Sequence, residues 1–180
     1  MRTIQVVPHD PAWPRTFERL REPIAAALAG LPATVEHVGS TSVPGLAAKP
    51  VIDIDVIAPH AALPEVVERL EGLGYVHRGN LGIEGREAFQ APDGLPEHHL
   101  YACRAGSLAV HNHLALRDFL RGHPDRAREY GELKVRLAAD HPHDIDAYIE
   151  GKTALIVSVL AECGLNPDDL GEVEAANRRS

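Results

Sequence analysis

Hydrophobic residues along the chain follow two different spacings, which separate a mixed first part from a helical second part. Alternating apolar and polar residues predict strands at 34–38, 51–57, 75–76, 87–90 and 99–103. Apolar residues three or four positions apart predict helices over 15–28, 63–73, 108–121, 125–139 and 145–163. The pattern therefore predicts strands and helices up to about residue 105 and three helices after it.

The chain has 180 residues, 44% of them hydrophobic, which is enough for one domain with a sizeable core. We expect a single domain over 1–165, with an α/β part to about residue 105 and a helical part over 106–165. The polar, charged segment 166–180 is typical of a flexible tail. Pairing among the helices of the last third also permits a homodimer.

Composition excludes some classes of function. The net charge of -8 argues against a broad basic surface for duplex nucleic acid. No apolar run approaches the roughly 20 residues that span a bilayer, and the first residues have no signal-peptide pattern, so we expect no membrane partner. Cys103 and Cys163 match no metal or redox spacing. Two reduced thiols fit a cytoplasmic protein.

Asp53 and Asp55 lie two residues apart on a predicted strand, so their side chains share one face. Two neighbouring carboxylates repel each other unless a positive charge lies between them. Mg²⁺ suits this position because it prefers oxygen ligands and also binds substrate phosphates. The alternative is that the pair is only the polar face of an exposed strand.

A small turn, Gly39-Ser40-Thr41, precedes the acidic pair. Glycine lets a backbone approach a phosphate closely, and the hydroxyls and amides of Ser40 and Thr41 can donate to its oxygens. A metal ion beside a phosphate-binding turn is typical of enzymes that transfer phosphoryl or nucleotidyl groups.

The stretch "HVGSTSVPGLAAKPVIDIDV" resembles the signature of the nucleotidyltransferase superfamily, a Gly-Ser turn followed about a dozen residues later by an acidic pair. Together with "RGNLGIEGREAF", "HHLYAC", "HLALRDFLRGHPDRAREYGELK" and "DAYIEGKTALI", it resembles the GrpB family over about residues 4–161. That family is also labelled a dephospho-CoA kinase or protein-folding accessory domain. The resemblance implies an α+β, nucleotidyltransferase-like fold, with a small mixed sheet, packed helices and a C-terminal helical part.

Nucleotidyltransferases of this type usually carry a third carboxylate on a neighbouring strand. The candidate strand here is "EHHLYAC", in which His99 stands on the face opposite Leu100. His99 is therefore the candidate third metal ligand or general base, and an imidazole ligand favours Mn²⁺ or Zn²⁺ over Mg²⁺. The alternative is that His98 and His99 are ordinary strand histidines.

Basic residues at helical spacing supply candidates for binding the phosphates. Arg117 and Arg121 are four positions apart and so lie on one helix face. Lys134 and Lys152 each follow a tyrosine by four positions. Arg86, in a glycine-flanked loop, and Lys49, just before the aspartate strand, are further candidates. The alternative for each is a solvated face or a salt bridge, for example with Asp118.

These residues predict metal-dependent transfer of a nucleotidyl group from a nucleoside triphosphate to a small-molecule or protein acceptor. Asp53, Asp55 and His99 would hold the metal, while the Gly39–Thr41 turn and the basic residues would hold the phosphates. A second hypothesis is a non-catalytic nucleotide-binding or accessory module. A third is a His/Asp metal hydrolase, which would need His99 plus His37, His98 or His113 around one metal ion.

Overall fold

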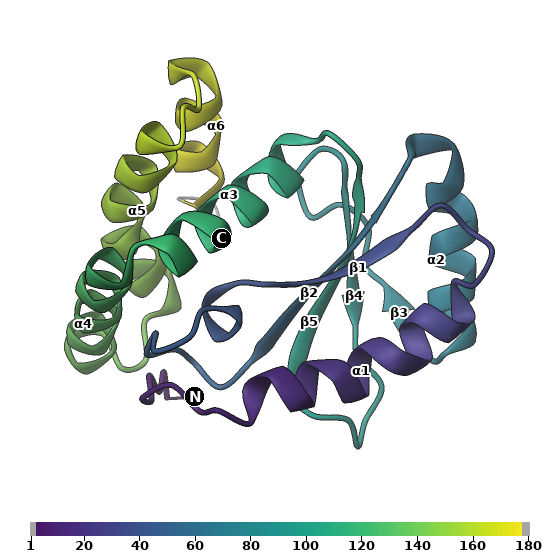
Figure 1. Ribbon diagram of the computed structural model, residues 1–180, viewed down its shortest axis with the longest axis horizontal. Coiled ribbons are helices and arrows are strands. Elements are labelled where there is room, and N and C mark those ends of the chain that lie inside the picture. The colour runs from purple at the N-terminus through teal and green to yellow at the C-terminus, as the bar shows by residue number, and fades with distance from the viewer. Residues whose placement is uncertain (1–2, 178–180) are drawn as a thin grey trace.

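A five-stranded sheet forms the centre of the computed structural model, which describes residues 3–177 (Figure 1). Its strands are β1 (Thr34–Val38), β2 (Ile52–Ala58), β3 (Val76–His77), β4 (Arg86–Gln90) and β5 (His98–Arg104). The order is β1-β2-β5-β4-β3, with β2 and β5 parallel and the other pairs antiparallel. The predicted α+β class with a small mixed sheet is confirmed.

Six helices and two 3-10 turns surround the sheet in the described part of the chain. The helices are α1 (Trp13–Ala27), α2 (Leu63–Gly72), α3 (Leu108–Gly122), α4 (Pro124–Asp140), α5 (Ile145–Glu162) and α6 (Pro167–Asn177). The 3-10 turns are η1 (Ser40–Ser42) and η2 (His60–Ala62). Several helices begin where local chemistry favours a start: Ser107 accepts a hydrogen bond from the Val110 amide before α3, and Asp144 does the same for Ala147 before α5.

The alternation of β2 sends its side chains to two different environments. Ile52, Ile54 and Val56 are buried against α1 and α2, together with Leu100 of β5. Asp53 and Asp55 therefore face the other side, toward α3 and the C-terminal helices. Figure 1 shows α1 and α2 on one side of the sheet, with α4, α5 and α6 grouped at the opposite end of the molecule.

A second core fills the helical part. Leu120 of α3, Tyr130 of α4 and Leu160 of α5 are buried there, together with Val43 and Leu46 from the segment after η1. Val43 and Leu46 come shortly after the Gly39–Ser42 turn in the sequence. Their burial in the helical core therefore fixes the position of the turn relative to the helices. No helix among residues 3–177 has both the length and the apolar character needed to cross a membrane.

The segment expected to be a flexible tail contains helix α6. Pro167 begins it, and Val173 is 4% exposed within the helical core. The sequence pattern concealed this helix because only a few apolar residues, Leu170 and Val173 among them, occur in an acidic stretch. Residues 178–180 of the predicted tail lie outside the described residues.

We predict that Val173→Ala lowers the free energy of unfolding by about 1–2 kcal/mol, since it removes buried methyl groups from the packed face of α6. Denaturant unfolding of the whole chain measures this change. Glu172→Ala, at an exposed neighbouring position, is the matched control. Equal stability of the two variants would show that α6 does not pack on the core.

Candidate functional site

Asp53 and Asp55 are each held by a histidine from a different element. The register pairs Asp53 with His99 and Asp55 with Tyr101 across β2 and β5, so all four share one face. His99 Nδ1 lies 2.8 Å from Asp53 Oδ1, and His113 Nδ1, from α3, lies 2.7 Å from Asp55 Oδ2. A carboxylate only accepts hydrogen bonds, so both Nδ1 atoms donate.

The two carboxylates differ in exposure. The side chain of Asp53 is 28% exposed, whereas that of Asp55 is 0% exposed and lies beneath His113. Asp55 Oδ1 is buried and has no hydrogen-bond partner. Burial by itself lowers the pKa of His113, but the hydrogen bond to Asp55 and the charges of both aspartates outweigh it and raise that pKa. His113 is thus a favoured counter-ion for Asp55.

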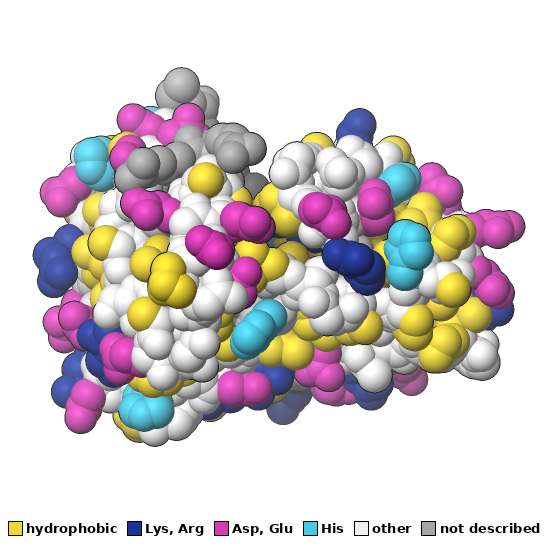
Figure 2. Space-filling view, turned by 90° about the horizontal axis from the view of Figure 1, so that it is seen from above, with side chains coloured by type: hydrophobic (Ala, Val, Ile, Leu, Met, Phe, Trp, Pro, Cys, Tyr) yellow, Lys and Arg dark blue, Asp and Glu magenta, His cyan; other side chains and the backbone are white. Residues whose placement is uncertain are grey.

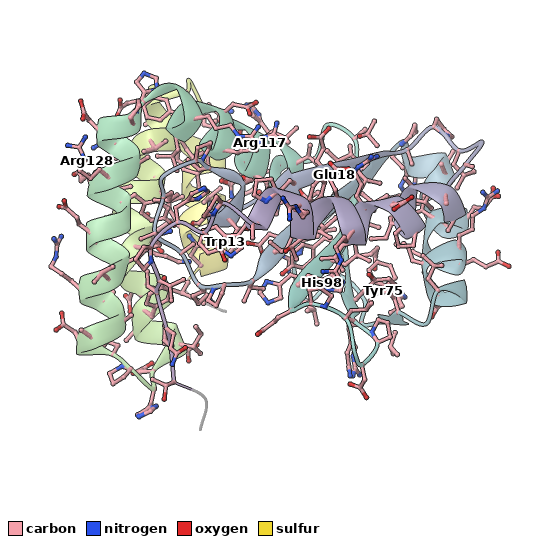
Figure 3. The ribbon with its side chains drawn as sticks, turned by 60° about the horizontal axis from the view of Figure 1, so that its bottom comes forward. Trp13, Glu18, Tyr75, His98, Arg117 and Arg128 are labelled. Carbon is pink, nitrogen blue, oxygen red and sulfur yellow. The ribbon has the colours of Figure 1, made fainter. Side chains whose placement is uncertain are left out.

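His99 does not complete a three-residue metal site with the aspartates. Its Nδ1–H is engaged by Asp53, and residues 3–177 contain no group of three or more His, Cys, Asp or Glu side chains arranged to hold a metal ion. Of the other histidines weighed for a metal hydrolase, His113 is hydrogen-bonded to Asp55, and His98 lies apart from the aspartates. His98 Nδ1 contacts the Pro96 carbonyl and its Nε2 contacts the Tyr75 hydroxyl on the opposite face of the sheet, where Figure 3 shows Tyr75 and His98 as neighbours.

The Gly39 turn is built around the side chain of Asp53. Gly39 has a φ of 69°, and a Cβ atom added to it would lie 2.1 Å from Asp53 Oδ2. Only glycine fits both the backbone angle and this close approach. The Ser42 hydroxyl donates to the Gly39 carbonyl at 2.6 Å and so closes the turn. The turn therefore presents Ser40 beside Asp53.

The Thr41 hydroxyl faces inward, in contrast to the predicted phosphate contact. It donates to the Val51 carbonyl at 3.2 Å and lies 3.0 Å from His37 Nε2. Because its proton goes to Val51, His37 Nε2 must donate to it. Thr41 and His37 thus tie the turn to the start of β2, and Thr41 retains only its backbone for a ligand.

His37 is held neutral within this network. Its ring stacks on Phe17 of α1 with centroids 4.6 Å apart, and it is 8% exposed. Burial, the largest influence, lowers its pKa to about 4 despite the nearby charge of Asp53. A neutral imidazole with its proton on Nε2 therefore supports the turn at neutral pH.

All three lysines of the chain gather beside Asp53. Lys134 Nζ lies 4.5 Å from the ring centre of Tyr130, and Lys152 Nζ lies 5.2 Å from that of Tyr148. Lys49 Nζ lies 5.7 Å from the same Tyr148 ring. We call these five residues the lysine–tyrosine cluster. The Tyr130 hydroxyl is hydrogen-bonded to Ser40, which links the cluster to the turn.

None of the three lysines of this cluster forms a salt bridge with a carboxylate among residues 3–177. Lys134 is 2% exposed, and its Nζ has no hydrogen-bond partner. Burial and the charge of Lys152 hold the pKa of Lys134 well below its usual value, while burial and Lys49 lower the pKa of Lys152 to about 8. The negative charge of Asp53 raises the pKa of both lysines, but by less than the other influences lower it. The cluster thus places three amines close together in a largely buried region beside Asp53.

The arginine candidates have divided roles. Arg117 donates to Glu36 at 2.8 Å, to the His37 carbonyl at 3.2 Å and to Asp118 at 2.8 Å, so it supports β1 rather than facing a ligand. Arg121 donates to the Ser42 carbonyl at 3.0 Å. Arg86 lies at the start of β4 rather than in the preceding loop, with its guanidinium 4.4 Å from the ring centre of Tyr101.

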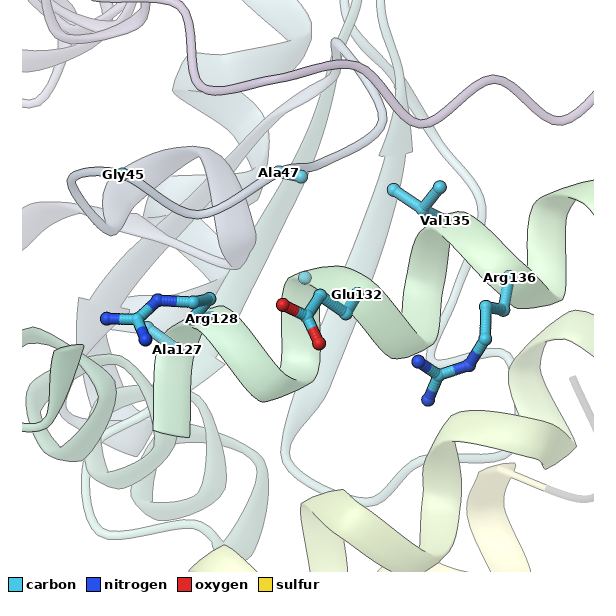
Figure 4. Close-up of a pocket in the computed structure, with 8 residues that line it drawn as sticks. Gly45, Ala47, Ala127, Arg128, Glu132, Val135 and Arg136 are labelled. Atoms are coloured by element: carbon cyan, nitrogen blue, oxygen red, sulfur yellow. The ribbon is translucent and has the colours of Figure 1, made fainter. Parts of the chain in front are cut away.

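One surface cavity is lined by neither aspartate. It has a volume of about 400 Å³ and is bounded by α4 residues such as Arg128, Glu132 and Val135, and by Gly45 and Ala47 opposite them (Figure 4). None of the predicted site residues lines it. The face of the molecule in Figure 2 carries scattered Asp and Glu side chains and few Lys or Arg side chains, so that face has no continuous basic surface.

Sequence reasoning missed three contacts between elements at the candidate site. His113 was weighed only as a metal ligand, although it pairs with Asp55 across 58 positions of sequence. The ring of Tyr101 packs against the guanidinium of Arg86, and Glu36 forms an ion pair with Arg117. The spacing of residues along the sequence does not predict such contacts, because each contact joins residues of different elements.

A family model described as GrpB protein matches residues 3–162. The chain belongs to the GrpB family. Its resemblance to that family, read from the motifs around Gly39 and Asp53, is confirmed.

Other GrpB and UPF0157 proteins match along most of this chain. The UPF0157 protein PA4798 of Pseudomonas aeruginosa is 41% identical over 164 residues, covering 87% of this chain and 66% of that protein. The UPF0157 protein YqkA of Bacillus subtilis is 36% identical over 152 residues, covering 84% of this chain and 44% of YqkA. The chain thus spans 44% and 66% of the length of these two curated relatives.

Among solved structures, the conserved protein GrpB from Enterococcus faecalis matches with a TM-score of 0.78 and 35% identity, covering 88% of this chain and 96% of that one. A Cid1 poly(U) polymerase chain matches with a TM-score of 0.46 and 16% identity, covering 74% of this chain and 43% of that one. The second likeness concerns the fold alone and carries no inference about activity.

We predict that Gly39→Ala destabilises the protein more than Gly45→Ala. Both residues have positive φ, but a Cβ at Gly45 meets no atom within 4 Å. The backbone penalty of about 1–2 kcal/mol applies to both, and the collision with Asp53 adds about 1–3 kcal/mol at Gly39 alone. Denaturant unfolding gives both values, and equal losses would refute the close packing of Gly39 on Asp53.

We predict that acid weakens the wild type more than His37→Gln. The unfolded chain protonates His37 near pH 6.5, whereas the folded protein does so only near 4, so the free energy of unfolding falls as pH falls through this interval. The loss attributable to His37 is about 2–3 kcal/mol. Glutamine keeps a donor for Thr41 but takes up no proton. Parallel stability curves from pH 7 to pH 4 would contradict a neutral His37.

Proposed function

We propose that this GrpB-family domain binds a nucleoside triphosphate with Mg²⁺ and transfers its nucleotidyl group to an acceptor. The observation that carries the proposal is the gathering of all three lysines beside Asp53, with the amine of Lys134 buried and unpartnered. A buried amine without a partner carries a desolvation cost that an anionic ligand offsets. A chain of phosphates supplies enough charge for several lysines.

Asp53 and Asp55 fit a magnesium ion better than a zinc ion. Each carboxylate uses one oxygen for a histidine, which leaves Asp53 Oδ2 and Asp55 Oδ1 for a cation, and Asp55 Oδ1 is the buried oxygen without a partner. Mg²⁺ is commonly held by one or two carboxylates, with waters and phosphates filling its other positions. Zn²⁺ usually takes three or four protein ligands, and residues 3–177 contain no such group.

The phosphates would lie between the Ser40 turn and the lysine–tyrosine cluster. Ser40 is hydrogen-bonded to Tyr130, and Lys134 follows Tyr130 by one turn of α4, so the turn and the cluster form one continuous lining. Phosphate oxygens that approach Lys134 and Lys152 would raise the pKa values of both amines and so favour their charged forms. In this site a bound Mg²⁺ would neutralise phosphate charge and so lower the barrier to attack.

His99 is suited to accept the proton of the attacking group. Its Nδ1–H is directed at Asp53, which leaves Nε2 as the basic nitrogen, and its side chain is 49% exposed. The acceptor's oxygen or nitrogen would attack the α-phosphorus while the bond to the bridging oxygen breaks and pyrophosphate leaves. Asp53 would stabilise the imidazolium that forms.

A non-catalytic nucleotide-binding module is the second candidate function. Two observations favour it. The strand β5 offers His99 rather than a third carboxylate, and Asp55 is fully buried with one of its two oxygens already hydrogen-bonded to His113. A module of this kind would use the same lysine–tyrosine cluster but leave the triphosphate intact.

We predict that one of the four nucleoside triphosphates, together with Mg²⁺, raises the melting temperature of the wild type. At 100 times its dissociation constant a ligand adds about 2.7 kcal/mol, which corresponds to roughly 5–10 °C for a chain of this size. Asp53→Asn and Lys134→Met should each remove most of the shift, because one loses the metal and the other a phosphate contact. Thermal denaturation with and without Mg²⁺ measures it.

Asp93→Asn, at an exposed position, is the matched control and should keep the full shift. Phosphorus NMR then distinguishes the two functions, with water taking the place of the acceptor. Slow formation of nucleoside monophosphate and pyrophosphate, lost in Asp55→Asn, supports transfer. An intact triphosphate supports the binding module, and no shift with any triphosphate would sink both.

A further inference from the structure

Arg86 lies on the same sheet face as the two aspartates, beyond Asp55. Arg86 of β4 is opposite Cys103 of β5, two residues past Tyr101, which is itself opposite Asp55. Residues opposite each other in a sheet share a face. With a rise of about 3.3 Å per residue, the levels of Asp55 and Arg86 are about 7 Å apart along the strands. The Gly39 turn follows Val38, opposite Asp53, so it lies at the other end of this row.

Among residues 3–177, the guanidinium of Arg86 has no anionic partner within salt-bridge distance. Its Nε is buried without a hydrogen-bond acceptor, and among residues 3–177 its side chain forms no ion pair. Arg117, on the same side of the sheet, is paired with both Glu36 and Asp118. A partly buried guanidinium without an acceptor is costly unless a ligand supplies one.

Tyr101 fixes the orientation in which Arg86 meets a ligand. The guanidinium lies over the Tyr101 ring at 4.4 Å, so its flat face is used for stacking. The planar fork of a guanidinium can still form two parallel hydrogen bonds to one oxyanion through its edge. The charge of Arg86 also acts on the aspartate site, since it lowers the pKa of His113, which is hydrogen-bonded to Asp55.

Two cationic regions therefore flank the acidic pair. The lysine–tyrosine cluster lies beside Asp53, and Arg86 lies beyond Asp55. We propose that Arg86 binds an oxyanion, a phosphate or carboxylate group, that belongs to the acceptor. The triphosphate is taken by the lysines at the other end of the row, so the group bound at Arg86 belongs to the second substrate. The assignment to the acceptor rests on the proposed function, whereas oxyanion binding at Arg86 does not.

The test measures binding of inorganic phosphate to the full chain by calorimetry. The parent protein is Lys134→Met/Lys152→Met, in which the lysine–tyrosine cluster no longer competes for phosphate. Adding Arg86→Gln should weaken phosphate binding at least tenfold. Adding Arg104→Gln is the matched control, because Arg104 ends β5 and is paired with Glu84. Arg104→Gln should leave the dissociation constant unchanged.

Arg86→Lys separates charge from geometry and also serves if the glutamine variant fails to fold. Lysine keeps the charge but loses the flat fork, so phosphate should bind several-fold more weakly than to the parent. Acetate competing with phosphate at equal concentration would identify a carboxylate-bearing acceptor, and its failure to compete would identify a phosphate-bearing one.

Equal phosphate affinity in the parent and both Arg86 variants, or no phosphate binding by the parent, would overturn the proposal. Failure of the proposed function has a different signature. In that case no triphosphate binds the wild type, while phosphate still binds the parent and is lost with Arg86→Gln. That result keeps the oxyanion site and removes its assignment to an acceptor.

Discussion

The parallel pairing of β2 with β5 is the constraint on which the rest of this structure depends. It buries the apolar side chains of β2 against α1 and α2, and this burial leaves Asp53 and Asp55 on the opposite face. A shift of one residue in this register would turn both carboxylates into the apolar core, which is prohibitively costly. The same register brings His99 level with Asp53. The acidic site is thus a by-product of how the core is packed.

Charge in the site is separated rather than neutralised. Histidines partner the two aspartates, yet Asp55 Oδ1 has no partner, and neither do Lys134 Nζ and Arg86 Nε. Structures rarely leave such atoms buried and unpaired without a reason, because each carries a desolvation cost. The unpaired atoms belong to one acidic and two basic side chains. A ligand that carries both a cation and anionic groups would supply partners for all of them. This arrangement underlies the proposal of a metal–nucleotide complex.

Local pattern was sufficient for most elements and for the central motif. The alternation of β2 predicted that Asp53 and Asp55 share a face, and the spacing of apolar residues predicted the two helices that carry Lys134 and Lys152. Helix α6 was missed because packing of Val173, rather than a strong periodic pattern, stabilises it. The inward turn of Thr41 was also missed, since its partners His37 and Val51 are set by the path of the turn.

By itself, the sequence determined the α+β class, the family and the candidate residues for a metal or phosphate site, because these depend on local spacing and side-chain chemistry. Only the tertiary structure decided which of those residues meet. In the folded chain, Arg117 is paired with Glu36 and His113 is hydrogen-bonded to Asp55. The three lysines lie together beside Asp53. Such choices depend on contacts between elements far apart in the chain. Helix packing and sheet register set those contacts, and no short stretch of sequence encodes them.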